Sequence, residues 1–250
     1  MTQNPESTQF GEKTVTADEK TTLVRGVFDS VADNYDIMND LMSGGIHRQW
    51  KNHLIRKIRP KAHYSYLDVA GGTGDIAFRI REKLGQKADI TLCDLNWDML
   101  RVGRDRAVDK GWLNEFEWVT GNAETLPLPD QAFDIYTISF GLRNVTHIDD
   151  ALKEAHRVLK PGGKFFCLEF STVENPFLSR LYDGFSYNII PKIGKTVAKD
   201  EGSYRYLVES IRKFPSQKQL VERIEAAGFS HVAYENLSFG VAAIHSAIKL

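Results

Sequence analysis

A glycine-rich turn between an apolar run and a helical repeat constrains the fold of this chain more than any other feature. Residues 64–70 read as a strand, residues 71–74 contain three glycines, and residues 75–84 space their apolar side chains as a helix does. Glycine has no side chain, so a ligand can approach the backbone closely at such a turn. This segment predicts one unit of strand, ligand-binding loop and helix.

The alternation of strands and helices continues along the chain. We expect strands at residues 89–94, 116–120, 132–140 and 164–170, and helices at 97–109 and 148–159, with a Lys-Pro-Gly-Gly turn at 160–163 ending the second helix. This order predicts an α/β fold with a mostly parallel sheet covered on both faces. After a helix at 217–227, the runs 232–237 and 241–248 are joined by three residues, too few for a parallel crossover. They predict an antiparallel hairpin at the sheet edge.

The other segments are expected to surround this sheet. Residues 1–14 are predicted to be a flexible tail and residues 15–250 a single domain. The chain of 250 residues is long enough for an ample core. Within it, residues 15–60 form an N-terminal cap of helices, around 16–31, 35–42 and 46–58. Residues 171–215 form an aromatic-rich insertion that we interpret as a lid over the core.

Charge, cysteine and histidine content exclude several classes of function. The 32 basic and 33 acidic residues give a formal net charge of −1, so we expect no nucleic-acid partner. Cys93 and Cys167 lie in apolar runs and are expected to be buried strand residues. The seven histidines show no metal-ligand spacing, so no metal is expected. No apolar run suggests a signal or a membrane span, which favours a cytoplasmic location and leaves contact with the inner membrane face open.

An acidic residue after the second strand adds to the glycine loop. Asp94 lies 20 residues beyond Gly74, where a carboxylate can accept hydrogen bonds from both hydroxyls of a ribose. Loop and acid together predict a nucleoside cofactor, and both NAD and S-adenosylmethionine fit them. Asp75 at the helix start would repel a diphosphate, and Asp68 adds a second carboxylate, which favours a cationic cofactor. A helix-capping role for Asp75 is the structural alternative.

Together with the segment 121–130 after the third strand, these motifs resemble the class I S-adenosylmethionine-dependent methyltransferases. From about residue 10 onward the chain is similar to the ubiquinone/menaquinone biosynthesis C-methyltransferases, which act on demethylmenaquinol or on a 2-polyprenyl-6-methoxy-1,4-benzoquinol. The motifs that carry this likeness are Tyr35-Asp36-x-Met38-Asn39, Leu67-Asp68-x-Ala70-Gly71-Gly72-Thr73-Gly74-Asp75, Ser139-Phe140-Gly141-Leu142-Arg143-Asn144-Val145, Leu168-Glu169-Phe170-Ser171 and Ser203-Tyr204-Arg205-Tyr206-Leu207. Ala70 stands where many class I enzymes carry their first glycine, and this family resembles the chain there as well.

The resemblance implies a doubly wound, Rossmann-like sheet of seven strands and transfer of a methyl group to a ring carbon of a polyprenyl benzoquinol or demethylmenaquinol. Another small-molecule O- or N-methyltransferase on the same fold is the alternative. Peripheral contact with a membrane or a biosynthetic complex, and assembly into a homo-oligomer, stay open. The aromatic residues between 177 and 193 then become candidates for lining the path of the prenyl tail. The implied cofactor-binding residues are Asp68, Gly72, Thr73, Gly74, Asp94, Asn122, Ala123 and Ser139.

The acceptor side requires a different kind of residue. An aromatic carbon is a poor nucleophile until a ring hydroxyl ionises, which costs roughly 4 kcal/mol at neutral pH for a phenol with a pKa of about 10. The candidates that can assist are Arg143, Asn144, Tyr35 and His47. Arg143 is preferred because a guanidinium past a strand end can stabilise the phenolate. The alternatives are that Arg143 pairs with a structural carboxylate and that His47 is a packing residue.

Overall fold

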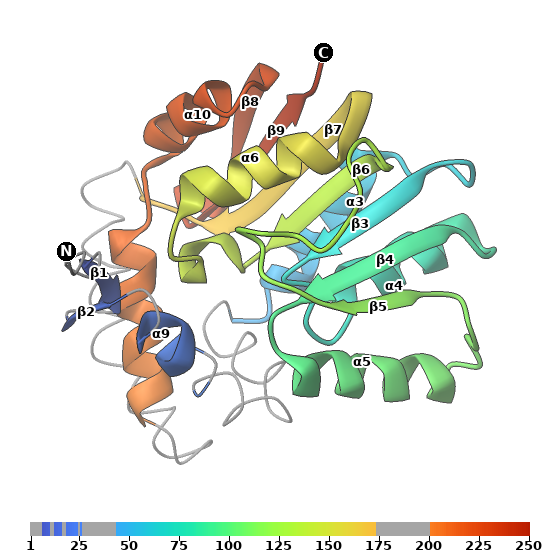
Figure 1. Cartoon of the computed structure of the whole chain (residues 1–250), viewed down its shortest axis with the longest axis horizontal. Helices are drawn as coiled ribbons and strands as arrows, with labels where there is room; N and C mark the ends of the chain where they lie inside the picture. Colours follow the sequence, from blue (N-terminus) through green and yellow to red (C-terminus); the bar gives the residue numbers. More distant parts are fainter. Residues whose placement is uncertain (1–6, 11–12, 17–18, 25, 27–43, 174–200) are drawn as a thin grey trace, which may run out of the picture.

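The computed structural model describes residues 7–10, 13–16, 19–24, 26, 44–173 and 201–250. A seven-stranded sheet forms its centre (Figure 1). The strands in spatial order are β5 (Glu117–Thr120), β4 (Asp89–Asp94), β3 (Ser65–Val69), β6 (Phe133–Ser139), β7 (Leu159–Phe170), β9 (Ala242–Ile248) and β8 (Ser230–Leu237).

The pairing directions confirm the predicted doubly wound sheet. The strands from β5 to β7 are parallel, and β9 is antiparallel to both β7 and β8. The short 3-10 helix η3 (Ser238–Gly240) joins β8 to β9, so the predicted C-terminal hairpin is present. The order of the strands reverses direction at β3, which places a crevice at the carboxyl ends of β3 and β6.

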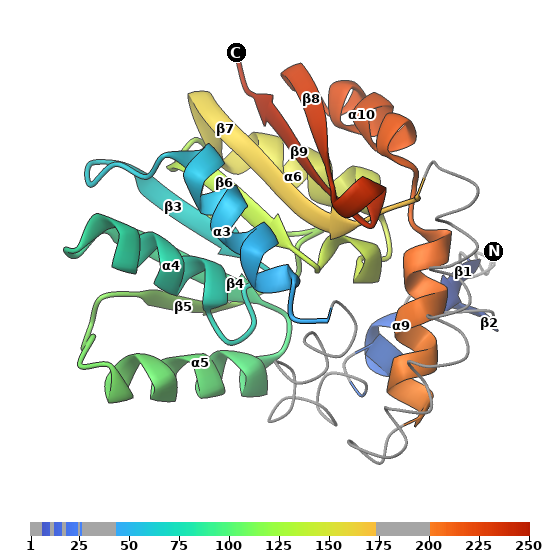
Figure 2. The ribbon, with the colours of Figure 1, turned by 180° about the vertical axis from the view of Figure 1, so that it is seen from behind.

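Helices cover both faces of the sheet and complete two cores. One core contains side chains of α3 (His47–Ile58), α4 (Asp75–Leu84) and α5 (Trp97–Asp109), which are seen from behind in Figure 2. The other core contains side chains of α6 (Ile148–Val158) and α10 (Gln217–Ala226). Cys93 and Cys167 are buried free thiols on β4 and β7, as predicted.

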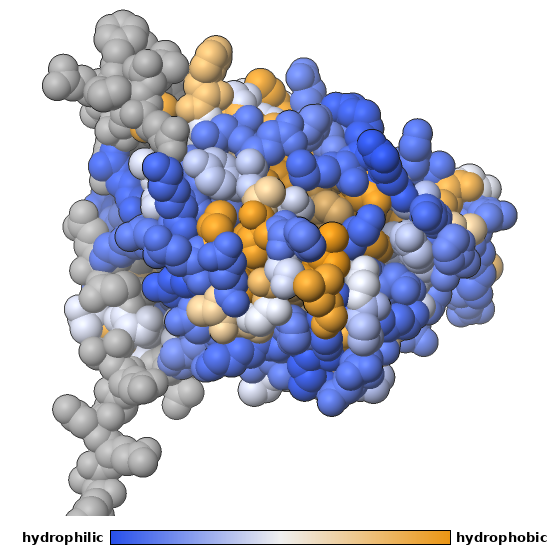
Figure 3. All heavy atoms as spheres, turned by 90° about the horizontal axis from the view of Figure 1, so that it is seen from above, coloured by the Kyte–Doolittle hydropathy of each residue, from blue (hydrophilic) through white to orange (hydrophobic). Residues whose placement is uncertain are grey.

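Figure 3 shows the molecule from above the view of Figure 1. Most of the described side chains on this face are polar, and apolar side chains gather near its middle. Within the residues that the structure describes, no helix is both long and apolar enough to cross a membrane.

Two segments differ from the sequence prediction. Within the segment expected as a flexible tail, β1 (Ser7–Phe10) pairs antiparallel with β2 (Lys13–Thr16), and Phe10 stacks on Tyr206 of α9 (Glu201–Lys213) at 4.2 Å between ring centroids. The threonine and valine residues of β1 and β2 favour strands, and the stacking gives the pair a distant partner.

The second difference is the start of β7. The strand begins at Leu159 and includes the predicted turn at 160–163. The backbone N–H of Gly162 donates to the Lys249 carbonyl at 2.7 Å, and the Lys249 N–H donates to the Gly163 carbonyl at 2.9 Å. The Pro-Gly-Gly sequence is therefore an irregular start of the strand, with a register shift opposite residues 133 and 135 of β6.

A steric contact between two strand ends gives a stability prediction. Ala70 has a left-handed φ of 51°, and a Cβ added to Gly141 would lie 2.4 Å from the Ala70 Cβ. We expect Gly141→Ala to lower the free energy of unfolding by about 1–3 kcal/mol because of overpacking. Ala70→Gly should remove most of that loss when the two changes are combined. Denaturant unfolding of the single and double variants tests this, and Gly26→Ala, whose added Cβ has no contact within 4 Å, is the control.

Candidate active site

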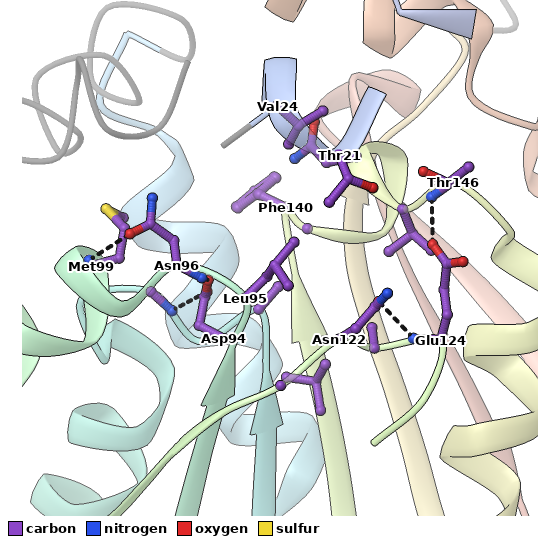
Figure 4. Close-up of a pocket in the computed structure, with 18 residues that line it drawn as sticks. Thr21, Val24, Asp94, Leu95, Asn96, Met99, Asn122, Glu124, Phe140 and Thr146 are labelled. Carbon is purple, nitrogen blue, oxygen red and sulfur yellow. Dashed lines mark hydrogen bonds between the residues drawn. The ribbon is translucent and has the colours of Figure 1, made fainter. Parts of the chain in front are cut away.

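A pocket lies at the carboxyl ends of the parallel strands, as the topology requires. Its volume is about 840 Å³, open mouth included. Its walls come from the segments that follow β3, β4, β5 and β6 and from the N-terminal helical residues 19–24 (Figure 4). Of the predicted site residues, Gly72, Asp94, Asn122, Ala123 and Asn144 line it.

Asp94 ties two of these segments together. Its Oδ2 accepts a hydrogen bond from the Gly72 N–H at 2.9 Å, and its Oδ1 accepts one from the Asn96 N–H at 2.8 Å. Burial raises the pKa of Asp94 to about 6, although these backbone donors act in the opposite direction. Asp94 lines the pocket. With a pKa of about 6, its carboxylate is mostly ionised at neutral pH and can accept further hydrogen bonds.

Asp68 lies beneath the glycine loop rather than at the pocket wall. It is buried, and its Oδ1 accepts a hydrogen bond from the Thr137 hydroxyl at 2.7 Å. Burial raises its pKa to about 7. In the part of the chain that the structure describes, the Oδ2 of Asp68 and the Oγ of Ser139 are buried without a hydrogen-bond partner. Two predicted cofactor residues thus retain unused hydrogen-bonding capacity beside the pocket.

Thr73 and Gly74 belong to the glycine loop but do not face the pocket. Thr73 is buried, and Gly74 precedes α4 with a φ of 87°, where a Cβ would lie 2.9 Å from the Phe78 ring. Neither residue lines the pocket. Their position fits a role in holding the loop backbone, and their predicted contact with the cofactor stays a prediction.

The segment after β5 forms the opposite wall. The Asn122 Oδ1 accepts a hydrogen bond from the Glu124 N–H at 3.0 Å, which fixes the turn that carries Ala123. Glu124 accepts from the Thr146 N–H at 2.9 Å and lies 2.6 Å from the His147 Nδ1. These contacts join the segment after β5 to the segment after β6, as Figure 4 shows for Glu124 and Thr146.

The 3-10 helix η2 (Leu142–Asn144) carries the preferred acceptor-side residue, Arg143. The Arg143 Nη1 donates to the Glu169 Oε1 at 2.7 Å, and the two side chains are 1% and 2% exposed. This contact is the structural ion pair that the sequence left as an alternative. Arg143 does not line the pocket, whereas Asn144 does, and the Asn144 Oδ1 accepts a hydrogen bond from the Tyr206 hydroxyl at 3.1 Å.

The remaining acceptor-side candidates are His47 and Tyr35. His47 is buried at the first position of α3 and does not line the pocket. Trp50, one turn later, packs against Phe140 and donates to the Ser238 hydroxyl, which is a packing role. Tyr35 and the predicted helix at 35–42 lie outside the described residues, as do residues 177–193.

Asp75 has two cationic partners, which weakens the sequence argument built on it. Its carboxylate lies 2.6 Å from both the Lys51 Nζ and the Arg79 Nε. Burial acts to raise the pKa of Asp75, but the two cations outweigh burial and lower it. Because its charge is compensated, Asp75 does not by itself distinguish a sulfonium ligand from a diphosphate.

Sequence reasoning missed several pocket residues. Thr21 and Val24 reach the pocket from the N-terminal helical residues and lie across it from Asp94 (Figure 4). Asn96 was recognisable, because an asparagine just before a helix is a capping signal, and its side chain accepts from the N–H groups of Asp98 and Met99. Across the described ranges, no group of three or more metal-ligating side chains is found.

Comparison with known proteins gives consistent matches. The model of the ubiE/COQ5 methyltransferase family matches residues 13–249. The ubiquinone/menaquinone biosynthesis C-methyltransferase UbiE of Brucella abortus is 56% identical over 243 residues, which cover 96% of this chain and 90% of that protein. The UbiE protein of Brucella anthropi is also 56% identical, over 96% of this chain and 92% of that protein.

Solved structures show the same fold at low sequence identity. A SAM-dependent methyltransferase from Thermotoga maritima has a TM-score of 0.63 and 19% identity, covering 91% of this chain and all of that one. Haemonchus contortus phosphoethanolamine N-methyltransferase 2, solved with S-adenosyl-L-methionine, has a TM-score of 0.59 and 15% identity, covering 80% of this chain and 52% of that one.

Proposed function

Because the chain belongs to the ubiE/COQ5 methyltransferase family, we propose that it is an S-adenosylmethionine-dependent C-methyltransferase of ubiquinone and/or menaquinone biosynthesis. Its acceptor is a polyprenyl benzoquinol or demethylmenaquinol, methylated on a ring carbon. The observation that carries this function is 56% identity over 96% of the chain to a C-methyltransferase of these pathways.

The pocket residues fit the cofactor. Asp94 offers carboxylate oxygens at the end of β4, suited to ribose hydroxyls, and Asn122 and Ala123 form the wall suited to the adenine. Gly72 lines the pocket without presenting a side chain to it, and a Cβ there would lie 3.2 Å from the Met99 Cε. The unused oxygens of Asp68 and Ser139 suit the ammonium end. When bound, S-adenosylmethionine supplies an electrophilic methyl group on its sulfonium.

The protein's own task is to position and ionise the acceptor. Holding a ring carbon at near-attack distance can contribute roughly 7–11 kcal/mol to lowering the barrier. Arg143 is proposed to stabilise the ionised hydroxyl from the end of β6, with Asn144, Tyr35 and His47 as further acceptor-side candidates. Within the described residues, the Arg143 Nε has no hydrogen-bond partner, so one edge of the guanidinium retains a donor.

A direct test uses labelled S-adenosylmethionine with each reduced quinol and detects the ring methyl group by mass spectrometry. We expect methylation of at least one quinol and none of the oxidised quinone, because the quinone has no electron-rich carbon. Protein that binds the cofactor but methylates neither quinol would contradict the proposed acceptor. Melting curves with S-adenosylmethionine and NAD provide a separate test of the cofactor.

Cofactor affinity should depend on pH through Asp94, whose pKa is about 6. Hydrogen bonds from the ribose favour the ionised carboxylate, so binding strengthens as the pH rises through 6 and levels off above it. We expect about tenfold weaker binding at pH 5 than at pH 7. Calorimetry should show a flatter profile for Asp94→Asn. An unchanged profile in that variant would assign the pH dependence to another group, such as Asp68.

Contact with a membrane is a further part of the proposal. A polyprenyl chain resides in a bilayer, so the enzyme must meet its acceptor at the membrane surface. We expect a cytoplasmic protein that attaches peripherally to the inner membrane face. Co-sedimentation with vesicles that contain a polyprenyl quinol tests this attachment.

A further inference from the structure

A second cavity adjoins the cofactor pocket, and Val145 and Thr146 line both. Its volume is about 960 Å³, open mouth included. Apolar side chains such as Ile148 and Phe214 form part of its wall, and no carboxylate occurs among its described lining residues. The cationic residues that line it are Lys20, Arg143, Lys213 and Arg223. The cavity therefore combines apolar walls with positive charge, which suits an ionised aromatic ring.

Lys20 lies at the border between the two cavities. It belongs to the helical residues 19–24, whose Thr21 and Val24 line the cofactor pocket. The Lys20 side chain is buried, with 7% of the residue exposed, and its Nζ donates to the Val145 carbonyl at 3.0 Å. An ammonium has three donors, and within the described structure this is the hydrogen bond that Lys20 makes. Two donors of a buried cation therefore remain for a ligand.

We propose that this second cavity binds the quinol hydroxyl that ionises, and that the Lys20 ammonium stabilises the resulting oxygen anion. The inference rests on the proposed function and adds a site and a residue to it. The hydroxyl proton passes to solvent water, and Lys20 remains protonated. A positive charge beside a phenol favours its ionisation. The ring carbon beside that oxygen then faces the cofactor pocket across the border at Val145 and Thr146.

The charges around Lys20 fit this role. Burial lowers the pKa of Lys20 overall, and the negative charge of Glu124 opposes this shift by favouring the ammonium. Glu124 itself lies 2.6 Å from the His147 Nδ1. The Arg143 guanidinium is paired with Glu169, and Arg223 lies 3.3 Å from Asp149, so both have carboxylate partners. The other titratable residues of the cavity are Tyr206 and Lys213 of α9.

The test compares Lys20→Met and Lys20→Gln, of which the second keeps a polar donor without the charge. With a short-chain quinol, we expect kcat at pH 7 to fall about 100-fold in both variants, with cofactor Kd within twofold of wild type. The limb of kcat that rises with pH should move up by about one to two pH units. Lys20→Arg should recover at least tenfold of the loss. Lys13→Met, a change at an exposed residue of β2, is the control.

The outcomes separate this inference from the proposed function. Wild-type protein that methylates no quinol would contradict the function itself. Active wild type with an unchanged kcat and an unchanged pH limb in a folded Lys20→Met or Lys20→Gln variant would overturn the role of Lys20 alone. A drop in melting temperature and cofactor affinity without a shift of the pH limb would make Lys20 a structural residue and would also overturn it.

Discussion

Loss of either partner of the Arg143–Glu169 ion pair should lower the free energy of unfolding by about 3–5 kcal/mol, because the remaining charge is left buried without its partner. Both side chains are at most 2% exposed. Glu169 also accepts hydrogen bonds from the backbone N–H groups of Arg143 and Phe170, at 3.3 and 2.9 Å. Urea unfolding of Arg143→Ala and Glu169→Gln measures the loss.

The double variant Arg143→Met/Glu169→Leu separates stability from catalysis. It leaves no unpaired charge, so we expect a stability loss of about 1–2 kcal/mol, mainly from the two backbone donors that lose their acceptor. Arg101→Ala is the surface control, since Arg101 is 57% exposed beside Asp98 and should cost less than about 0.5 kcal/mol.

Turnover in the folded double variant tests the proposed role of Arg143. If the guanidinium stabilises the ionised quinol, kcat should fall at least about 100-fold while cofactor affinity stays near that of wild type. Wild-type kcat in that variant would make Arg143 a structural residue only. Lys20 would then be the remaining described cation proposed to act on the acceptor.

Local patterns explain why most of the sheet was predictable. The segments of β3, α4, β4 and α5 carry apolar repeats bounded by glycine or a capping residue, and their observed bounds differ little from those expected. The start of β7 depends instead on two hydrogen bonds with Lys249, near the end of the chain. The Gly162 N–H donates to the Lys249 carbonyl, and the Lys249 N–H donates to the Gly163 carbonyl. The N-terminal strands likewise depend on Phe10 meeting Tyr206. Contacts so distant in sequence leave no local signal.

The site likewise contains residues that were predictable from the sequence and residues that were not. Gly72, Asp94, Asn122 and Ala123 follow strand ends, and a parallel sheet brings strand ends together, so their meeting was predictable. The partner of Arg143 was not, because the register of β6 on β7, with Ser139 opposite Leu168, determines which carboxylate lies next to η2. The positions of Lys20, Thr21 and Val24 depend on how the helical residues 19–24 pack at the carboxyl ends of the strands. No spacing in the sequence specifies that placement.

Replacement of Asp94 should have the largest effect on cofactor binding. We expect Asp94→Ala to weaken S-adenosylmethionine binding by about 3 kcal/mol, roughly 100-fold, since hydrogen bonds from the ribose to a charged acceptor are lost. The variant also removes the acceptor of the Gly72 and Asn96 N–H groups, so the loop loses part of its support. Calorimetry with S-adenosylhomocysteine measures the affinity without turnover.

The matched control for this prediction lies on the same strand. Asp89 begins β4 and is exposed, whereas Asp94 ends β4 at the pocket. Asp89→Ala should leave the dissociation constant within twofold of wild type, because the carboxylate lies at the opposite end of a six-residue strand. Asp94→Asn keeps one acceptor oxygen and should bind with intermediate affinity. Wild-type affinity in a folded Asp94→Ala protein would show that the ribose binds elsewhere and would refute the cofactor site proposed here.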